Sequence, residues 1–167
     1  MADYNKKLSE LHQRVVQAKA QVLATIDEHG WVQFKHPDLG ELEISLREYS
    51  PEHMILGCTF DDYATRSRED VMQICNSVNE TSGEVAHLRV SSTGGSYVHA
   101  LVHLLLAAPG RIPDEALLRE VIGPAISSIK AVAAQLAEEL PKLGGTEDCE
   151  RSPVVGLPLG NDCGRSV

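Results

Sequence analysis

Two histidines four residues apart, His99 and His103, come closest in this chain to a chemical site. On a helix both rings would share one face and could bind one Zn²⁺ ion, as in many metal-dependent hydrolases. On a strand the same spacing covers about 13 Å, which is too far for two imidazoles to share a metal. No glutamate lies between them to serve as a base. A metal-binding protein or hydrolase that uses His99 and His103 is therefore the alternative hypothesis.

Other polar clusters indicate structure more than catalysis. The segment Ser91–Ser96 has the glycines and serines of a phosphate-binding loop, but no Gly-Lys-Ser/Thr sequence follows, so a hairpin turn is favoured. Asp61 and Asp62 precede Glu69 and Asp70 without the alternating spacing of a calcium loop. Acidic residues are also typical of a helix start. Because the sequence has no Gly-x-Ser-x-Gly motif either, we expect no catalytic residue, metal or cofactor.

The four cysteines predict neither a zinc site nor a redox site. Cys58 and Cys75 fall inside an expected strand and an expected helix, where a cysteine serves as a small buried apolar group. Cys149 and Cys163 lie near the C-terminus, and no two cysteines have the Cys-x-x-Cys spacing. Such usage is typical of a cytoplasmic protein.

The composition excludes several classes of function. A formal charge of −9 and an aromatic content of 4% argue against binding to nucleic acid or to an anionic membrane, which needs clustered Lys and Arg or stacking rings. The longest apolar run, Ala100–Ala108, is far shorter than the roughly 20 residues that span a bilayer. The first residues lack the apolar core of a signal peptide. We therefore expect a cytoplasmic protein with one α+β domain over residues 1–143 and a disordered C-terminal tail over 144–167.

The first half of the domain is expected to contain one helix and three strands. Apolar residues at three- and four-residue spacing predict a helix from Asn5 to Glu28, closed by Gly30. The apolar stripe of this helix consists of Leu8, Leu11, Val15, Ala18 and Val22. Alternating residues between turn sequences then predict strands over 31–35, 41–46 and 54–60.

The second half is expected to contain a helix, two strands and a long helix. Ser67 is predicted to cap the first of these helices. Strands are predicted over 85–90 and 97–106, and the second has apolar residues at every other position. Asp114 is predicted to cap the last helix, which Pro124 would kink or break into two.

The element order α-β-β-β-α-β-β-α predicts an α+β fold. Strands that follow each other through short turns pair antiparallel, which gives a five-stranded antiparallel sheet. The apolar face of such a sheet must be covered, and the helices are expected to pack on it.

Two segments carry a resemblance to a known family. The sequences over 71–79 and 110–119, separated by a strand, a glycine-containing turn and a long apolar strand, resemble the YbjN family of bacterial proteins, which are described as sensory transduction regulators. The resemblance covers roughly residues 15–140 and implies the fold of the type III secretion chaperones. It also implies a small acidic homodimer that acts by binding proteins and has no catalytic residues.

The leading hypothesis is a non-enzymatic protein-binding domain, chaperone-like or regulatory, that acts as a homodimer and binds a segment of a partner protein. A partner strand could pair with the main chain at a sheet edge, and an exposed apolar groove could hold side chains. The candidate contact surface for a partner or a second copy is the stripe Leu8, Leu11, Val15, Ala18 and Val22. Burial of this stripe against the protein's own sheet is the alternative.

Overall fold

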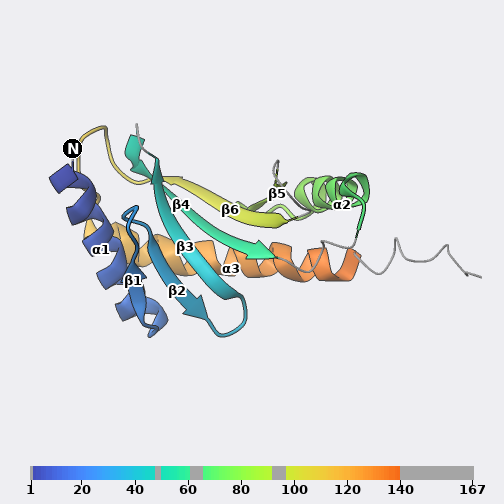
Figure 1. The fold of residues 1–167 in the computed structure, drawn as a ribbon, viewed down its shortest axis with the longest axis horizontal. Coiled ribbons are helices and arrows are strands. Elements are labelled where there is room, and N and C mark those ends of the chain that lie inside the picture. Colours follow the sequence, from blue (N-terminus) through green and yellow to red (C-terminus); the bar gives the residue numbers. More distant parts are fainter. Residues whose placement is uncertain (1, 48–49, 61–65, 92–96, 140–167) are drawn as a thin grey trace, which may run out of the picture.

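In the part of the chain that the structure describes, six strands form one antiparallel sheet, with hydrogen-bonded neighbours in the order β1-β2-β3-β4-β6-β5 (Figure 1). The computed structural model describes residues 2–47, 50–60, 66–91 and 97–139. In chain order the elements are α1 (Ala2–Ala20), β1 (Ala24–Ile26), β2 (Val32–His36), β3 (Gly40–Arg47), β4 (Ser50–Phe60), α2 (Arg68–Thr81), β5 (His87–Val90), β6 (Val98–Leu105) and α3 (Glu115–Glu139). The predicted α+β class is confirmed, with six strands in place of the predicted five.

The strands bury alternate residues, so the sheet has one apolar face. In β3 and β4, Leu42 lies opposite Cys58 and Ile44 lies opposite Leu56, and all of these side chains are buried. In β6 the predicted apolar positions are buried at every other residue from Val98 to Val102. An antiparallel sheet with this pattern packs one face on a core and leaves the other in water.

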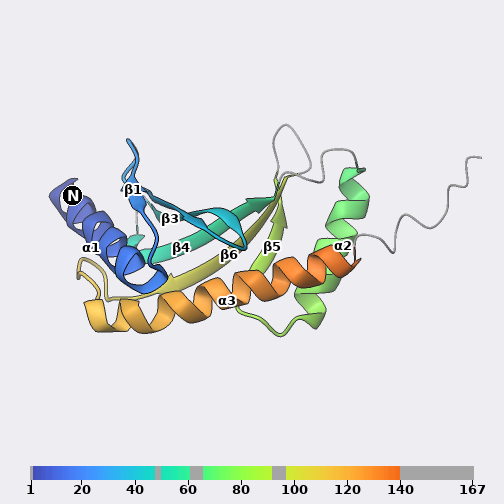
Figure 2. The same ribbon diagram turned by 90° about the horizontal axis from the view of Figure 1, so that it is seen from below.

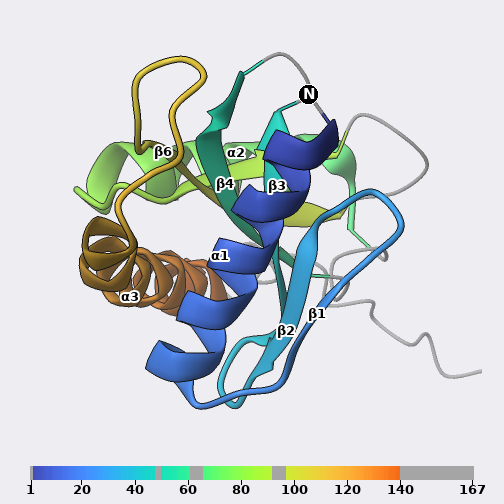
Figure 3. The ribbon, with the colours of Figure 1, turned by 90° about the vertical axis from the view of Figure 1, so that its left-hand side faces the viewer.

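The helices cover the apolar face. Helix α3 runs along it, and α1 and α2 lie near its two ends (Figure 2). Helix α1 packs between α3 and the hairpin of β1 and β2 (Figure 3). Helix α2 contacts α3 and β5 at the opposite end of the sheet. Apart from Leu8, the buried apolar residues of these elements belong to one cluster, which includes Val15, Leu56, Val102 and Ile129.

The sixth strand arises because α1 is shorter than predicted. The helix ends at Ala20, and not at Glu28. Gln21 has a positive φ of 54°, a conformation that stops a helix and that glycine usually supplies. The residues that follow, Ala24–Ile26, include two β-branched side chains, which favour extended backbone, and they pair with β2. The last residue of the predicted stripe, Val22, therefore lies beyond the end of the helix, although it keeps the three- and four-residue spacing.

Gly30 belongs to the turn between β1 and β2, and not to a helix end. Its φ is 81°, which glycine adopts without strain. The Asp27 carboxylate accepts hydrogen bonds from the backbone N–H groups of His29 at 2.9 Å and Trp31 at 2.8 Å. Ser9 on α1 donates a hydrogen bond to the Gly30 carbonyl at 2.6 Å. These bonds fix the hairpin and join it to the helix.

Side-chain caps begin the other two helices as predicted. Ser67 Oγ accepts a hydrogen bond from the Asp70 N–H at 3.2 Å, and Asp114 Oδ1 accepts one from the Ala116 N–H at 2.9 Å. Pro124 does not divide α3, which continues as one helix on both sides of it. The ring is exposed, so water can bond the carbonyl that lacks its usual donor.

Some predictions fall outside the described residues. These concern the tail over 144–167, the acidic pair Asp61 and Asp62, and most of the Ser91–Ser96 turn. Within the described residues, no helix is both long and apolar enough to cross a bilayer.

His12 on α1 is a buried ionisable side chain in this core. Its exposed fraction is 1%, and neither ring nitrogen has a hydrogen-bond partner among the described residues. Burial lowers the pKa of the imidazole to about 4, because a charged ring would lose its hydration. The neutral ring is therefore the folded form at neutral pH.

Acid should destabilise the fold through His12. The unfolded chain binds a proton at the ordinary pKa of 6.5, whereas the folded chain binds it only near pH 4. The free energy of unfolding is therefore at its full value above pH 6.5. It falls by about 3 kcal/mol as the pH decreases from 6.5 to 4. Urea unfolding at intervals across this range measures the loss, and His12→Leu should remove it.

The matched control is His29→Leu, because His29 is exposed and the same replacement there removes no buried ring. If the stability of His12→Leu varied with pH as steeply as that of the wild type, the account of a buried neutral ring would be wrong.

Candidate interaction surface

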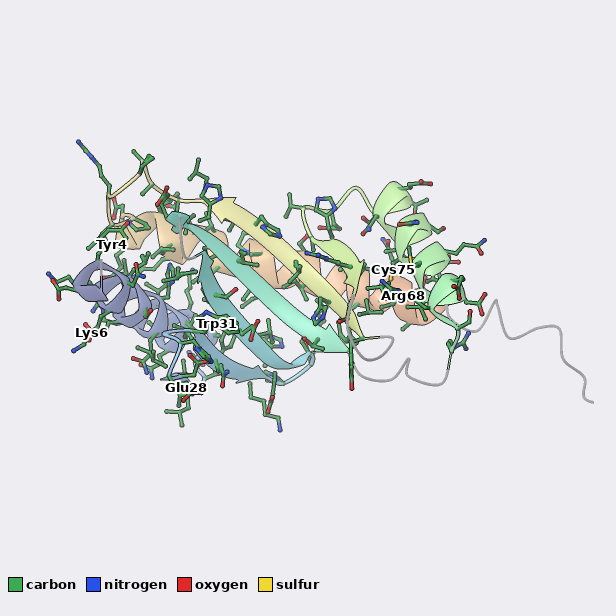
Figure 4. All side chains as sticks on the ribbon, turned by 45° about the horizontal axis from the view of Figure 1, so that its top comes forward. Tyr4, Lys6, Glu28, Trp31, Arg68 and Cys75 are labelled. Carbon is green, nitrogen blue, oxygen red and sulfur yellow. The ribbon has the colours of Figure 1, made fainter. Side chains whose placement is uncertain are left out.

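No helix of the described residues covers the second face of the sheet, and Figure 4 views this face with α3 behind the strands. Because side chains alternate along a strand, this face carries the odd-numbered residues. We call it the open face, and its members are Thr25, Gln33, Lys35, Glu41, Glu43, Ser45, His53, Ile55, Gly57, Thr59, His87, Arg89, His99, Leu101, His103 and Leu105. All of them except Gly57 are exposed or half-buried.

A groove of about 640 Å³ lies on the open face above β1 to β4. Two leucines outside the strands, Leu23 and Leu39, contribute apolar surface to it, and Leu23 is 81% exposed. The polar lining includes Lys35, Glu41 and Glu43. An exposed Leu23 and a half-buried Leu39 beside polar side chains are typical of a surface that binds another polypeptide.

Glu43 gives the groove an acidic centre. Burial raises the pKa of this half-buried carboxyl, and the nearby charge of Asp27 raises it further. The Asp27 carboxylate accepts a hydrogen bond from Gln33 Nε2 at 3.2 Å, whereas Glu43 forms no ion pair with a described residue. A cationic group placed in the groove would favour the ionised form of Glu43.

The centre of the open face is apolar. A Cβ atom added to Gly57 would lie 3.0 Å from Leu101 Cδ2, so the Leu101 side chain lies directly over the glycine. Ile55 is half-buried next to it on β4, and Leu105 on β6 is 65% exposed. These side chains form a small apolar patch on β4 and β6 beside the groove, with His103 between Leu101 and Leu105 and opposite Ile55.

The histidine pair of the sequence analysis lies on β6. His99 and His103 both belong to the open face, and His99 Nδ1 is 3.0 Å from Thr59 Oγ1. Their four-residue spacing along an extended strand does not bring both rings to one ion. The described residues contain no group of three or more His, Cys, Asp and Glu side chains that could hold a metal.

Helix side chains bond backbone groups at part of the β5 edge of the sheet. Asn79 Nδ2 donates a hydrogen bond to the Leu88 carbonyl at 2.9 Å, and Asn79 Oδ1 accepts one from the Leu88 N–H at 2.8 Å. The buried Ser128 Oγ of α3 accepts a hydrogen bond from the Ala86 N–H at 2.9 Å. The amide of Asn79 therefore takes the place of a neighbouring strand at Leu88.

The β1 edge is closed in a similar way. The Ala24 carbonyl accepts hydrogen bonds from Gln13 Nε2 at 2.8 Å and Gln17 Nε2 at 3.1 Å, both from α1. A strand from a partner would have to displace these side chains before it could pair there. The expectation that sheet edges offer main-chain pairing is therefore wrong at Ala24 and Leu88. Sequence reasoning missed these caps because each joins residues from different elements, with no local signal.

The predicted contact stripe lies mostly inside the protein. Leu8, Leu11 and Val15 are buried in the core, with exposed fractions of 0%, 6% and 0%. Ala18 is exposed, and Val22 lies beyond the end of α1 and is half-buried. The packing of Leu8, Leu11 and Val15 corresponds to the alternative reading of the stripe, burial against the protein's own sheet.

The two described cysteines have unreactive surroundings. Cys58 and Cys75 are free and buried. Burial raises the pKa of each thiol to about 11, so neither forms the nucleophilic thiolate near neutral pH. Both side chains belong to the apolar core.

Comparisons with known proteins give a likeness in fold only. No protein family matches the sequence, and no curated protein matches it. Among solved structures, the chain is similar to the crystal structure of YbjN from E. coli, described as a proposed transcription regulator, with a TM-score of 0.49 and 10% sequence identity. The match covers 78% of this chain and 89% of that chain. No functional residue is carried over from it.

Removing the Asn79 side chain should open the β5 edge. In Asn79→Ala the N–H and C=O of Leu88 lose their partners, so we expect a loss of about 1–3 kcal/mol in the free energy of unfolding. Free strand edges also pair with one another, so the variant should form larger assemblies at high concentration. Urea unfolding measures the first effect and static light scattering the second.

Asn76→Ala is the matched control, because Asn76 is exposed on the same helix. Equal stability and equal scattering of the two variants would contradict a protective role for Asn79.

Proposed function

We propose that this chain is a non-enzymatic protein-binding domain, chaperone-like or regulatory, that acts as a homodimer and binds a segment of a partner protein in the groove of the open face. The observation that carries the proposal is the groove itself, where exposed Leu23 lies beside the acidic Glu41 and Glu43. An apolar segment would pack on Leu23 and Leu39 of this groove.

Binding in the groove would depend on side chains and not on strand addition. The caps on Leu88 and Ala24 occupy backbone groups that an added strand would need. The open face has no such caps, because its exposed groups are side chains. The partner segment would therefore lie across the strands or along them without extending the sheet.

The proposal assigns no catalytic role. The thiols of Cys58 and Cys75 are buried with raised pKa values, and His99 and His103 are spread along one strand. A cytoplasmic location is part of the proposal, because free cysteines are the norm in a reducing compartment.

A charge placed in the groove should block binding. Proteins retained by the immobilised full chain from a lysate of the encoding organism are identified, and the affinity of each purified candidate is measured by calorimetry. Leu23→Glu should weaken the binding of a true partner about tenfold or more, because it puts a charge on an apolar contact. Leu23 is so exposed that its replacement should leave the fold intact.

Met72→Glu on the outer face of α2 is the matched control, since Met72 is also exposed. This variant should bind like the wild type. The proposal fails if no protein binds, if Leu23→Glu has unchanged affinity, or if Met72→Glu is the variant that loses binding.

A further inference from the structure

We infer that a second copy of the chain packs on the open face from β3 to β5, through a two-fold axis that runs along the strands between β4 and β6. This inference rests on the homodimer of the proposed function and gives that dimer an interface. Its basis is the arrangement of charges on the open face, which is self-complementary about that axis.

Within β3 to β5, the two sides of the open face carry opposite charge. One row of residues crosses the sheet from β3 to the edge strand β5. In strand order it consists of Glu43, Gly57, Leu101 and His87. The neighbouring row on the same face lies two positions further along each strand. It has Glu41 on β3 and Arg89 on β5. Within β3 to β5, Glu41 and Glu43 therefore lie on one side of the apolar centre and Arg89 lies on the other, whereas Lys35, opposite Glu41, lies on β2 outside these strands.

A two-fold axis between β4 and β6 exchanges these halves. It lays β3 of one copy over β5 of the other, so Glu41 faces Arg89 of the second copy and Glu43 faces His87 of the second copy. The same contacts occur twice, as an isologous interface requires. Two sheets packed face to face keep their strands within about 30° of each other, which preserves this register near the axis.

The charges that would pair form no ion pair with a described residue of their own chain, although Lys35 is the cross-strand neighbour of Glu41. Glu41, Glu43 and Arg89 form no ion pair with any residue that the structure describes. Three strand spacings separate β3 from β5, about 14 Å, so Glu41 and Arg89 of one copy are too far apart to bond. A second copy brings each within reach of the opposite charge.

The centre of this interface is apolar. Leu101 lies over Gly57 beside the axis, so the Leu101 side chains of two copies would meet there. Ile55 lies in the next row of the same patch. An apolar centre with charged groups around it is the usual anatomy of a protein interface.

Part of the groove would stay free in such a dimer. The axis lays β3 to β5 of the two copies over one another, whereas β1 and β2 lie outside the overlap. Leu23 and Leu39, at the β1 and β2 end, would therefore remain available to a partner segment at each end of the dimer.

Charge exchange tests this interface. The mass of the wild type in solution, measured by sedimentation equilibrium, should be twice 18.2 kDa. Glu41→Arg and Arg89→Glu should each weaken the dimer roughly tenfold to a hundredfold, because each puts like charges face to face twice. An equimolar mixture of the two variants should recover a heterodimer, because each unlike pair then has opposite charges. The double variant should recover a homodimer for the same reason.

Two control variants carry the same change of charge away from the open face, Glu120→Arg on α3 and Lys19→Glu on α1, both at exposed positions. These should remain dimeric, and circular dichroism should show every variant folded. A monomeric wild type would overturn both this interface and the homodimer of the proposed function. If Glu41→Arg and Arg89→Glu both remained dimeric, the interface alone would be overturned. The same conclusion would follow if the two variants stayed monomeric when mixed.

Discussion

The backbone groups at the edges of a single sheet must find partners, and the way this chain satisfies them determines the rest of its surface. On the β5 edge, Asn79 bonds both backbone groups of Leu88, and on the β1 edge two glutamines bond the Ala24 carbonyl. These bonds tie α2 and α1 to the ends of the sheet, while α3 covers its apolar face. The open face remains for contact with another polypeptide. Contacts on this face are made by side chains and not by backbone groups.

Strands and helix caps were predictable wherever the residues that determine them lie close together in the sequence. The alternation in β3 and β6 and the caps Ser67 and Asp114 are each encoded within a few residues. Strand β1 was not predictable, because Gln21 ends α1 in a conformation usually taken by glycine and the apolar spacing continues beyond it. The groove and the charge division of the open face depend on strand order, which places β6 between β4 and β5. Periodicity alone could not show that order.

In the proposed function the open face serves both dimer formation and the binding of a partner segment, which often use separate surfaces. Its apolar centre at Leu101 is small, so association there must draw on charged groups at both sides. Those groups are divided between Glu41 and Glu43 on one side and Arg89 on the other, which favours a second copy over an unrelated surface of uniform charge. Leu23 before β1 and Leu39 in the turn between β2 and β3 lie outside the strands that overlap, so a partner segment would contact these leucines while Glu41 and Glu43 pair with the second copy. A chain with a net charge of −9 gains no attraction from its overall field, which leaves the local pairing to determine the contact.

The central claim, that the open face is the working surface, is tested most directly by histidine footprinting with diethylpyrocarbonate. His87 and His103 are exposed on the open face, whereas the exposed His29 lies in the turn between β1 and β2. Labelling is measured by mass spectrometry at a dilute concentration and at one where the chain self-associates. The account predicts that His87 and His103 become protected on association while His29 labels equally at both concentrations. Protection of His29 with unchanged labelling of His87 and His103 would contradict it.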